Sequence, residues 1–311
     1  MSGRIPDTNA YLNQLAPTPL TPVSLRKGGP AIWCKLEFLN PSGSTKDRIA
    51  RFILKKAWRE GQVGPGYTVI EASSGSTSIA MALACAQLGM RFIAVMPEGV
   101  SNERVLMIRA YGGEIRLTSK DQGIVGAIAE TERLAAAIPQ SFLPRQFANI
   151  ENAQAHRMTT AREILDQIPG GNVDAVVSGV GTGGTLAGLY QGFRDAGCEV
   201  KPYHAKPIAL TSTPEIECCS FSARIPGVVN CVSTIFREEE MKSLAVVEIR
   251  DEEAIAATRE LIRLGFPVGP SSGLNYLAAL RAHEDLGGDV AVVTVFPDRM
   301  ERYFTTELFR L

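Results

Sequence analysis

Short apolar runs rich in β-branched residues alternate along this chain with longer segments of helical period. The runs YTVIEA, RFIAVMP, DAVVSGV and VAVVTVFPD begin at residues 67, 91, 174 and 290, and helix-like segments follow the first three. Parallel strands are buried on both faces and are joined by helices, so this alternation predicts βαβ units. The expected fold class is therefore α/β.

The length of the chain bears on the number of domains. At about 150 residues per domain, 311 residues allow two domains or one large α/β unit. The segment PRQFANIEN separates the third unit from the helix-like AQAHRMTTAREILDQI, which places a boundary near residue 150. We predict an N-terminal region, 1–150, containing a smaller α/β domain at about 40–150, and a larger C-terminal domain, 151–311, joined by 1–35.

Charge and cysteine content narrow the class of partner. The chain has 32 basic and 33 acidic residues and a net charge of −1, without a dense basic block, so we expect neither nucleic acid nor a membrane as a partner. No apolar run is long enough to span a bilayer. The six cysteines show no CxxC spacing, which predicts no metal site and no disulfide framework, and Cys218 and Cys219 are interpreted as buried thiols rather than a redox pair. A small-molecule ligand and a cytoplasmic location are expected.

A glycine-rich loop follows the run DAVVSGV and precedes a helix-like segment. It consists of Gly181, Thr182, Gly183, Gly184 and Thr185. Glycines allow backbone N–H groups to approach an anion, and the start of the next helix adds partial positive charge, so this loop is a candidate phosphate site. It fits neither the dinucleotide nor the P-loop pattern, and a tight strand-to-helix connection is the alternative.

Two further turns carry clustered hydroxyl groups. The segment EASSGSTSIAMA places Ser73, Ser74, Ser76 and Thr77 at the start of a helix, which suits a carboxylate or phosphate; the alternative is an ordinary N-cap. In GFPVGPSSG, the residues 270–273 precede another helix-like segment. The three turns would form one ligand site if all lay at the carboxyl ends of parallel strands.

Lys46 stands in NPSGSTKDRIA, between a run of small residues and a helix-like segment. It could bind phosphate, face solvent, or act as a nucleophilic amine with a pKa lowered by partial desolvation. A lysine that begins a helix is unfavourable for the helix dipole, but position alone leaves a solvated surface lysine as the alternative. Lys55, Lys56 and Lys120 are interpreted as surface lysines.

Seven segments resemble one family in order and spacing. They are KLEFLNPSGSTKDRIA, EASSGSTS, MPEGVSNERVLMIRAYGGEI, RQFANIENAQAHRMTTAREI, GVGTGGTLAG, GPSSG and ERYFTTELF. The chain resembles the pyridoxal-phosphate enzymes of fold type II, in particular the cysteine synthase and cystathionine β-synthase family and its short cysteine synthase B form. The resemblance implies two α/β domains, each with a mostly parallel twisted sheet flanked by helices, a pyridoxal 5′-phosphate cofactor and a homodimer.

The resemblance also implies roles for individual residues. Lys46 matches the lysine that binds the cofactor covalently and acts as the catalytic base, and Gly181–Thr185 match the loop that holds the cofactor phosphate. Ser271 matches the serine facing the pyridine nitrogen, with Ser272 as the alternative if the register differs by one residue. The residues matching the substrate-carboxylate site are Ser73, Ser74, Ser76, Thr77 and Gln146, of which Ser76 also matches a cofactor contact.

The chain departs from the family pattern at two places. Ser76 stands where cysteine synthases usually carry asparagine, and the segment around IPGV, residues 225–228, lacks the family's usual flanking loops. We interpret His156 as structural and assign no metal or triad role to His204 or His283. Packing and hydrogen bonding are expected of Arg302 and Tyr303, and Asp298 is expected near the cofactor ring without an assigned role.

These features predict a pyridoxal-phosphate enzyme that catalyses β-replacement on serine or an O-activated serine, most simply with sulfide to give cysteine. A neutral serine at the pyridine nitrogen favours prompt loss of a β-leaving group. Ser76 keeps a β-eliminating lyase open as the alternative, of the cysteine desulfhydrase or serine dehydratase type. A binding protein that retains the fold without turnover is the third possibility.

Overall fold

The computed structural model describes residues 15–208, 224–228 and 233–310. The strands are β1 Leu20–Val23, β2 Ile32–Lys35, β3 Thr68–Ala72, β4 Arg91–Pro97, β5 Glu114–Thr118, β6 Ser141–Phe142, β7 Ala175–Gly179, β8 Lys201–Ile208, β9 Ala245–Arg250 and β10 Val292–Val295. The helices are α2 Lys46–Arg59, α3 Ser76–Leu88, α4 Asn102–Ala110, α5 Gly123–Ala137, α6 Glu151–Ala155, α7 Ala161–Gln167, α8 Gly184–Asp195, α9 Asp251–Arg263 and α10 Pro270–Leu286. The short helical turns are η1 Glu37–Leu39, η2 Lys120–Gln122, η3 His156–Thr160, η4 Pro169–Gly171, η6 Glu238–Glu240, η7 Met300–Tyr303 and η8 Glu307–Phe309.

The smaller sheet has four parallel strands in the order β5-β4-β3-β6. Its strands are apolar on both faces: Val69 packs with α2 and α3, and the next residue, Ile70, packs on the opposite face with α5. Burial on both faces explains why these strands read as continuous apolar runs in the sequence.

The larger sheet has six strands in the order β1-β2-β10-β7-β8-β9. All neighbouring pairs are parallel except β1 and β2, which are antiparallel. Ala175 and Val177 of β7 belong to the core covered by α9 and α10, while Val176 between them belongs to the core covered by α7 and α8. The α/β class and the mostly parallel sheets predicted from the sequence are confirmed.

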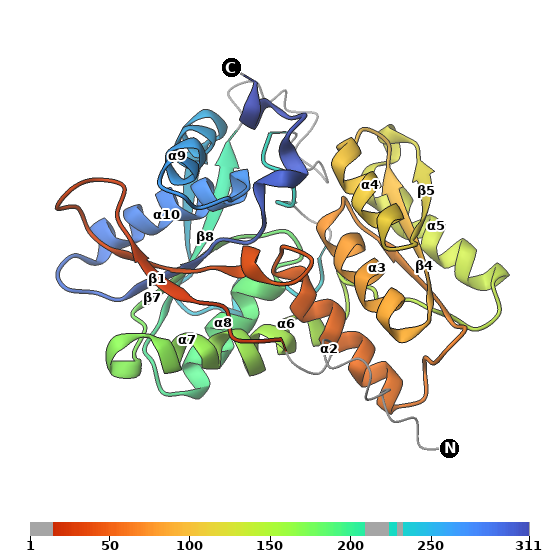
Figure 1. Cartoon of the computed structure of the whole chain (residues 1–311). Coiled ribbons are helices and arrows are strands. Elements are labelled where there is room, and N and C mark those ends of the chain that lie inside the picture. Colours follow the sequence, from red (N-terminus) through yellow and green to blue (C-terminus); the bar gives the residue numbers. More distant parts are fainter. Residues whose placement is uncertain (1–14, 209–223, 229–232, 311) are drawn as a thin grey trace.

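The two sheets lie side by side, with α2 between them (Figure 1). Helix α2 contacts α3, which covers the smaller sheet, and α6, which precedes the helices of the larger one. The division of the chain into domains at residue 150 stays a prediction, although β1 and β2 do belong to the larger sheet. No helix of the described ranges is both long and apolar enough to cross a bilayer.

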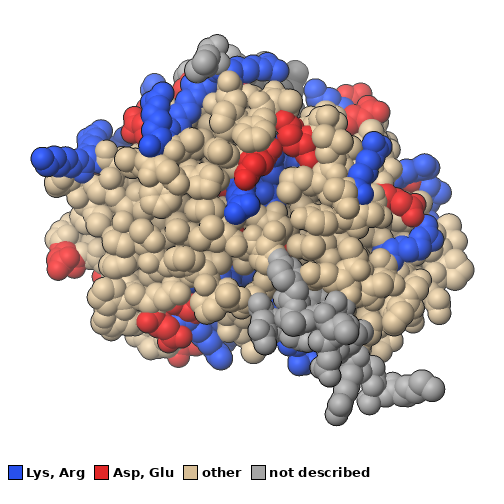
Figure 2. All heavy atoms as spheres, viewed as in Figure 1, with Lys and Arg blue, Asp and Glu red and all other residues tan. Residues whose placement is uncertain are grey.

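Charged side chains are scattered over the face seen in Figure 2. Wide uncharged areas separate the basic and acidic side chains, and neither kind of charge covers a continuous part of this face. A nucleic-acid site would need a basic stripe or patch, which this face does not offer.

The third hydroxyl-bearing turn differs from the expectation. The segment before Pro270 is not a strand, since Val268 makes only an isolated bridge with Arg299, and α10 begins at Pro270 itself. Proline is favoured in the first turn of a helix because its missing N–H has no intrahelical acceptor there. Ser271 and Ser272 are therefore in the first turn of α10 rather than in a loop after a parallel strand.

Candidate active site

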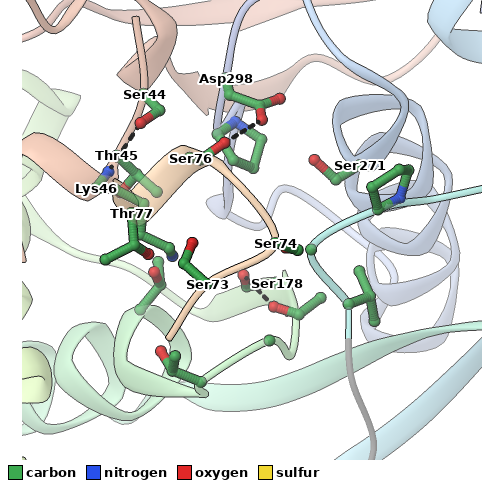
Figure 3. Close-up of a pocket in the computed structure, with 18 of the residues that line it drawn as sticks. Ser44, Thr45, Lys46, Ser73, Ser74, Ser76, Thr77, Ser178, Ser271 and Asp298 are labelled. Atoms are coloured by element: carbon green, nitrogen blue, oxygen red, sulfur yellow. Dashed lines mark hydrogen bonds between the residues drawn. The ribbon is translucent and has the colours of Figure 1, made fainter. Parts of the chain in front are cut away.

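One pocket, open to solvent, lies between the two sheets and is lined by most of the predicted residues (Figure 3). It is bordered by the loops after β3, β7 and β10, at the carboxyl ends of strands in both sheets. The predicted residues that line it are Lys46, Ser73, Ser74, Ser76, Thr77, Gln146, Gly181, Thr182, Gly183, Thr185 and Ser271. Gly184 does not line the pocket. It packs against Asn152 so closely that a Cβ on Gly184 would lie 2.0 Å from the Asn152 Oδ1.

Lys46 is the first residue of α2, directly after Thr45. None of the described residues accepts a hydrogen bond from its Nζ. Burial lowers the pKa of this ammonium below its ordinary value of 10.5, although the carboxylates of Asp298 and Glu37 act in the opposite direction. The positive end of α2 also disfavours a cation at this position. Lys46 is therefore an amine whose neutral, nucleophilic form is more accessible than that of a surface lysine.

The segment Ser73–Thr77 comprises the turn after β3 and the first two residues of α3, and it is held from within. The Ser73 Oγ accepts hydrogen bonds from the N–H of Gly75 at 2.9 Å and of Ser78 at 3.4 Å. The Thr77 hydroxyl donates to Gln146 Oε1 at 2.6 Å, and Gln146 Nε2 donates to the carbonyl of Ala72 at 2.6 Å. Gln146 thus fixes both ends of the loop as well as lining the pocket.

A buried carboxyl lies under the same loop. The Glu71 oxygens accept hydrogen bonds from the N–H groups of Ala72 and Gln146. Burial raises the pKa of Glu71 to about 8, and these two hydrogen bonds only partly oppose it. At neutral pH this group is mostly uncharged, so it does not repel an anion bound at the loop.

The glycine-rich loop follows β7 and leads into the N-terminus of α8. A Cβ on Gly181 would lie 2.2 Å from the carbonyl oxygen of Gly227, so the chain passes too close here for any side chain. The first N–H groups of α8 have no intrahelical acceptors. Gly181, Gly183 and the Thr185 side chain form the pocket wall at this helix start, as an anion site requires.

We expect Gly181→Ala to weaken retention of a phosphate-bearing ligand by at least about tenfold, because the added methyl displaces backbone and with it the N–H groups of the loop. Equilibrium dialysis of the ligand measures the effect. Gly64→Ala is the control, since a Cβ at Gly64 meets nothing within 4 Å. Equal retention by both variants would contradict the role of this loop.

Ser271 and Ser272 are distinguished by their positions on α10. Ser271 lines the pocket across from Lys46, as Figure 3 shows. Ser272 is fully buried, does not line the pocket, and its hydroxyl lacks a hydrogen-bond partner among the described residues. The geometry favours Ser271 over the alternative register.

Ser76 is tied to a carboxylate from the other side of the pocket. Its hydroxyl donates to Asp298 Oδ2 at 3.1 Å, and the Tyr303 hydroxyl donates to the same oxygen at 2.7 Å. Asp298 follows β10, and Tyr303 belongs to η7. Ser76, where the resemblance implies an asparagine, therefore binds Asp298.

His156 supports the pocket without lining it. It begins the π-helical turn η3, which interrupts the helix predicted over AQAHRMTTAREILDQI, and its ring is fully buried. One ring nitrogen lies 3.0 Å from the Thr160 hydroxyl, and the other lies 3.2 Å from the Thr185 hydroxyl. Burial lowers the pKa of His156 to about 3, so it is neutral and positions Thr185.

Several lining residues were not predicted as site residues. They are Ser44, Thr45, Arg104, Phe147, Ser178, Gly179, Pro226, Gly227, Val228, Asn275, Val295 and Pro297. Asn275 accepts a hydrogen bond from the Gly179 N–H and donates to the Val295 carbonyl, which joins the ends of β7 and β10. Three residues of the IPGV segment, Pro226, Gly227 and Val228, contribute directly to the wall. Cys218 and Cys219 lie outside the described residues.

A family model described as pyridoxal-phosphate dependent enzyme matches residues 11–298. The chain belongs to this family. Cysteine synthase B of Campylobacter jejuni is 36% identical over 92% of this chain and 94% of its own length. A hydrogen sulfide-producing enzyme of Fusobacterium nucleatum has 33% identity and a TM-score of 0.86, over 97% of this chain and 92% of that one. The O-acetylserine dependent cystathionine β-synthase of Helicobacter pylori has 31% identity and a TM-score of 0.83, over 96% and 98%.

The pocket suits the cofactor of this family of pyridoxal-phosphate enzymes. The cofactor carries an aldehyde, a phosphate and a pyridine nitrogen. The pocket offers a complementary group for each of the three. The Lys46 amine, which has no hydrogen-bond acceptor among the described residues, suits the aldehyde, and the closely packed glycine loop at the start of α8 suits the phosphate. The Ser271 hydroxyl across the pocket suits the pyridine nitrogen. The chemistry of the donor set therefore fits pyridoxal 5′-phosphate.

Proposed function

We propose that this enzyme catalyses β-replacement on serine or an O-activated serine, most simply with sulfide to give L-cysteine. The observation that carries the proposal is the placement of the Lys46 amine in one pocket with the Ser73–Thr77 loop and the Gly181–Thr185 loop. The similarity to cysteine synthase B of Campylobacter jejuni supports it. The substrate is accordingly a small amino acid.

Each group of the pocket has a task in this reaction. Gly181–Thr185 would hold the cofactor phosphate, and Ser271 the pyridine nitrogen. The loop Ser73–Thr77, kept in shape by Gln146, would bind the substrate carboxylate through its N–H and hydroxyl groups. The bound cofactor supplies an electron sink for negative charge at the substrate α-carbon.

Lys46 would serve first as the covalent anchor of the cofactor and then as the base. Once its amine is free, it takes the proton from the α-carbon, the β-substituent leaves, and the nucleophile adds at the β-carbon. Lys46 then returns the proton to the α-carbon. Burial lowers the pKa of this amine and so favours the neutral form that a base requires.

A β-eliminating lyase is the second candidate. It is favoured by Ser76, which is bound to Asp298 where the family usually has asparagine, and by the similarity to a hydrogen sulfide-producing enzyme. In this reaction water and tautomerisation would take the place of the second nucleophile, and pyruvate would be released.

A substrate panel decides between the two. The purified protein, loaded with pyridoxal 5′-phosphate, is given O-acetylserine, O-phosphoserine, serine or cysteine, each with and without sulfide, and cysteine and pyruvate are measured. We expect cysteine from at least one O-activated serine when sulfide is present. Pyruvate in equal amounts with and without sulfide would favour the lyase, and the absence of both products from loaded protein would reject both.

Assembly and location are part of the same proposal. We infer a homodimer from the family resemblance, which light scattering on a sizing column tests. A cytoplasmic location is in keeping with Cys34, Cys85 and Cys198, which are buried free thiols.

A further inference from the structure

His204 is a buried histidine behind the pocket that the reaction outlined above does not use. It lies on β8, is 6% exposed, and stands beside Ser178 of β7, which lines the pocket. Neither ring nitrogen of His204 has a hydrogen-bond partner among the residues that the structure describes. Burying a polar ring in this way costs stability that an apolar ring would not cost. His204 is therefore a candidate for a role beyond filling space.

The His204 ring packs against Phe236. The two rings meet edge to face, with their centroids 5.5 Å apart and their planes at 70°. Aromatic pairs favour this geometry, because the positive edge of one ring meets the negative face of the other. His204 is held by the sheet, whereas Phe236 belongs to no helix or strand. The histidine thus supports the phenyl ring.

Phe236 in turn packs against the glycine-rich loop. A Cβ on Gly183 would lie 2.2 Å from the Phe236 Cβ, so the phenylalanine occupies the space that a side chain at position 183 would need. Gly183 lines the pocket, is the N-cap of α8, and has a φ of +76°, which favours glycine. The contact therefore bears on the peptide groups at which α8 begins and at which an anion is expected to bind.

A second contact joins the segment 233–236 to the same loop. The Ser233 hydroxyl donates to the carbonyl of Thr182 at 2.5 Å, and its oxygen accepts from the N–H of Ile235 at 3.1 Å. The segment thus holds two consecutive residues of the loop, Thr182 by a hydrogen bond and Gly183 by the packing of Phe236. His204 supports the second of these contacts.

We propose that His204 is a positioning residue for the cofactor phosphate. Through Phe236 it holds Gly183, and with it the N–H groups at the start of α8, in the conformation that binds the phosphate. This inference rests on the proposed function, which assigns the phosphate to Gly181–Thr185. His204 does not line the pocket, so it acts through the loop rather than by contact with cofactor or substrate.

The ring of His204 is neutral when it packs in this way. Burial lowers its pKa from 6.5 to about 4, and the ammonium of Lys206 acts in the same direction. Lys206 is the next residue but one along β8 and pairs with Glu248 at 3.4 Å. The exposed Glu238 of η6 faces the ring, with its Oε1 4.0 Å from Nδ1, and the residues paired with His204 on β7 and β9 are uncharged. Protonation would draw the ring towards Glu238 and away from Phe236.

The test compares the binding of pyridoxal 5′-phosphate with that of pyridoxal, which lacks the phosphate, by the full chain freed of cofactor. Equilibrium dialysis gives both dissociation constants, and their ratio reports what the phosphate adds, because the two ligands share the ring and the aldehyde. We expect His204→Ala to lower the preference for pyridoxal 5′-phosphate by about tenfold at neutral pH, with little change in the affinity for pyridoxal.

Matched variants locate the effect. Phe236→Ala should lower the preference as His204→Ala does, and the double variant should lower it no further, because both changes act through one contact. His283→Ala removes a half-buried histidine of α10 that does not line the pocket, and it should behave as wild type.

The conservative variant His204→Phe adds a pH profile. It keeps an aromatic ring against Phe236 and should retain the preference at neutral pH. At about pH 4, where half of the histidine is protonated, wild type should have lost about twofold more of its preference than His204→Phe. Protonation of the ligand's own phosphate is common to both proteins and cancels.

The outcomes separate this inference from the proposed function. Equal affinity of wild type for the two ligands would contradict the phosphate site itself. A wild-type preference that His204→Ala retains, or an equal loss of affinity for both ligands, would overturn the role of His204 alone. If His204→Ala did not fold by circular dichroism, Phe236→Ala and the pH comparison with His204→Phe would decide. None of these measurements depends on turnover.

Discussion

Lys46→Ala is expected to lower kcat for β-replacement by about a thousandfold, with the fold intact. The amine at position 46 has the two tasks of anchoring the cofactor and moving the α-proton, and the described residues offer no second lysine in the pocket. Lys46 opens α2, where a cation is unfavourable, so its removal should not destabilise the helix. Product formation under saturating substrate gives kcat, and circular dichroism gives the fold.

Lys55→Ala provides the matched control, because Lys55 lies on the same helix and does not line the pocket. It should keep nearly the full rate. Added primary amines should restore part of the activity of Lys46→Ala, since they can take over the transfer of the proton. Residual activity of Lys46→Ala above about a tenth of wild type would be incompatible with the role of base.

The sequence pattern predicted the part of the site that is local. The loops after β3 and β7 each lie within one strand-to-helix connection, so apolar periodicity followed by glycine or hydroxyl residues was enough to locate them. The register of Ser271, by contrast, could be resolved only from the structure, because both serines lie in the first turn of α10 and only Ser271 of the two lines the pocket.

The contact between Arg104 and Tyr303 could not be found in this way, because packing between distant segments brings the two residues together. The Ser101 hydroxyl donates to the Arg302 carbonyl, and the Glu103 carboxylate accepts hydrogen bonds from Thr305. These contacts join α4 to the C-terminal turns across about 200 residues of sequence. A basic residue in a helical pattern gives no sign that it will be buried in the wall of a pocket.

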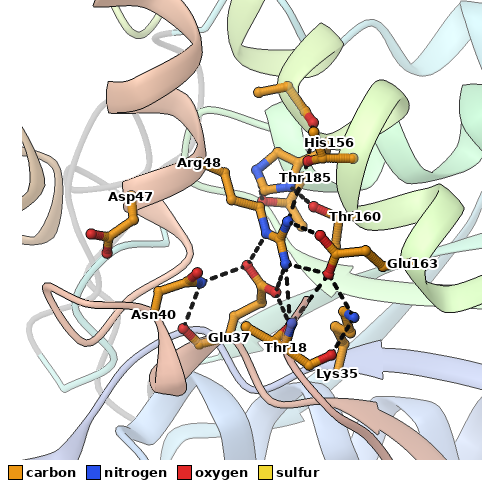
Figure 4. Close-up of polar contacts among 12 residues, drawn as sticks. Thr18, Lys35, Glu37, Asn40, Asp47, Arg48, His156, Thr160, Glu163 and Thr185 are labelled. Atoms are coloured by element: carbon orange, nitrogen blue, oxygen red, sulfur yellow. Dashed lines mark hydrogen bonds and ion pairs between the residues drawn. The ribbon is translucent and has the colours of Figure 1, made fainter. Parts of the chain in front are cut away.

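A buried network of charges fixes the start of α2, and thereby Lys46, to the larger sheet (Figure 4). Arg48 lies at its centre: the Nε and Nη2 donate to Glu37 at 2.6 and 2.7 Å, and the Nη1 and Nη2 donate to Glu163 at 2.6 and 2.8 Å. Lys35, on β2, lies 2.9 Å from the Glu163 Oε2. Arg48 and Lys35 carry two positive charges, and Glu37 and Glu163 carry two negative ones. Removing any one of these side chains therefore leaves a buried charge uncompensated.

The Glu37 carboxyl makes this network sensitive to acid. Burial alone would raise its pKa, but the Arg48 guanidinium and the Thr18 hydroxyl outweigh burial and lower the pKa from 4.5 to about 2. A carboxyl with a lowered pKa in the folded state stabilises that state above its unfolded pKa. The contribution, about 3 kcal/mol by the size of the shift, is complete above about pH 4.5 and is lost as the pH falls towards 2.

Glu37→Gln should therefore lower the free energy of unfolding at neutral pH by about 3 kcal/mol, because Arg48 loses one of its two anions inside the protein. Urea titrations followed by circular dichroism, between neutral pH and about pH 3.5, measure the difference from wild type, which should shrink as the pH falls.

Glu114→Gln is the control, since Glu114 pairs with Arg91 at the surface, where both side chains are more than half exposed, and should cost under about 1 kcal/mol. Equal losses in the two variants, or a Glu37→Gln difference that does not change with pH, would show that the network does not hold α2. Because Arg48 is two residues from Lys46, a confirmed loss should also lower the activity of Glu37→Gln, through displacement of the base rather than through any contact with substrate.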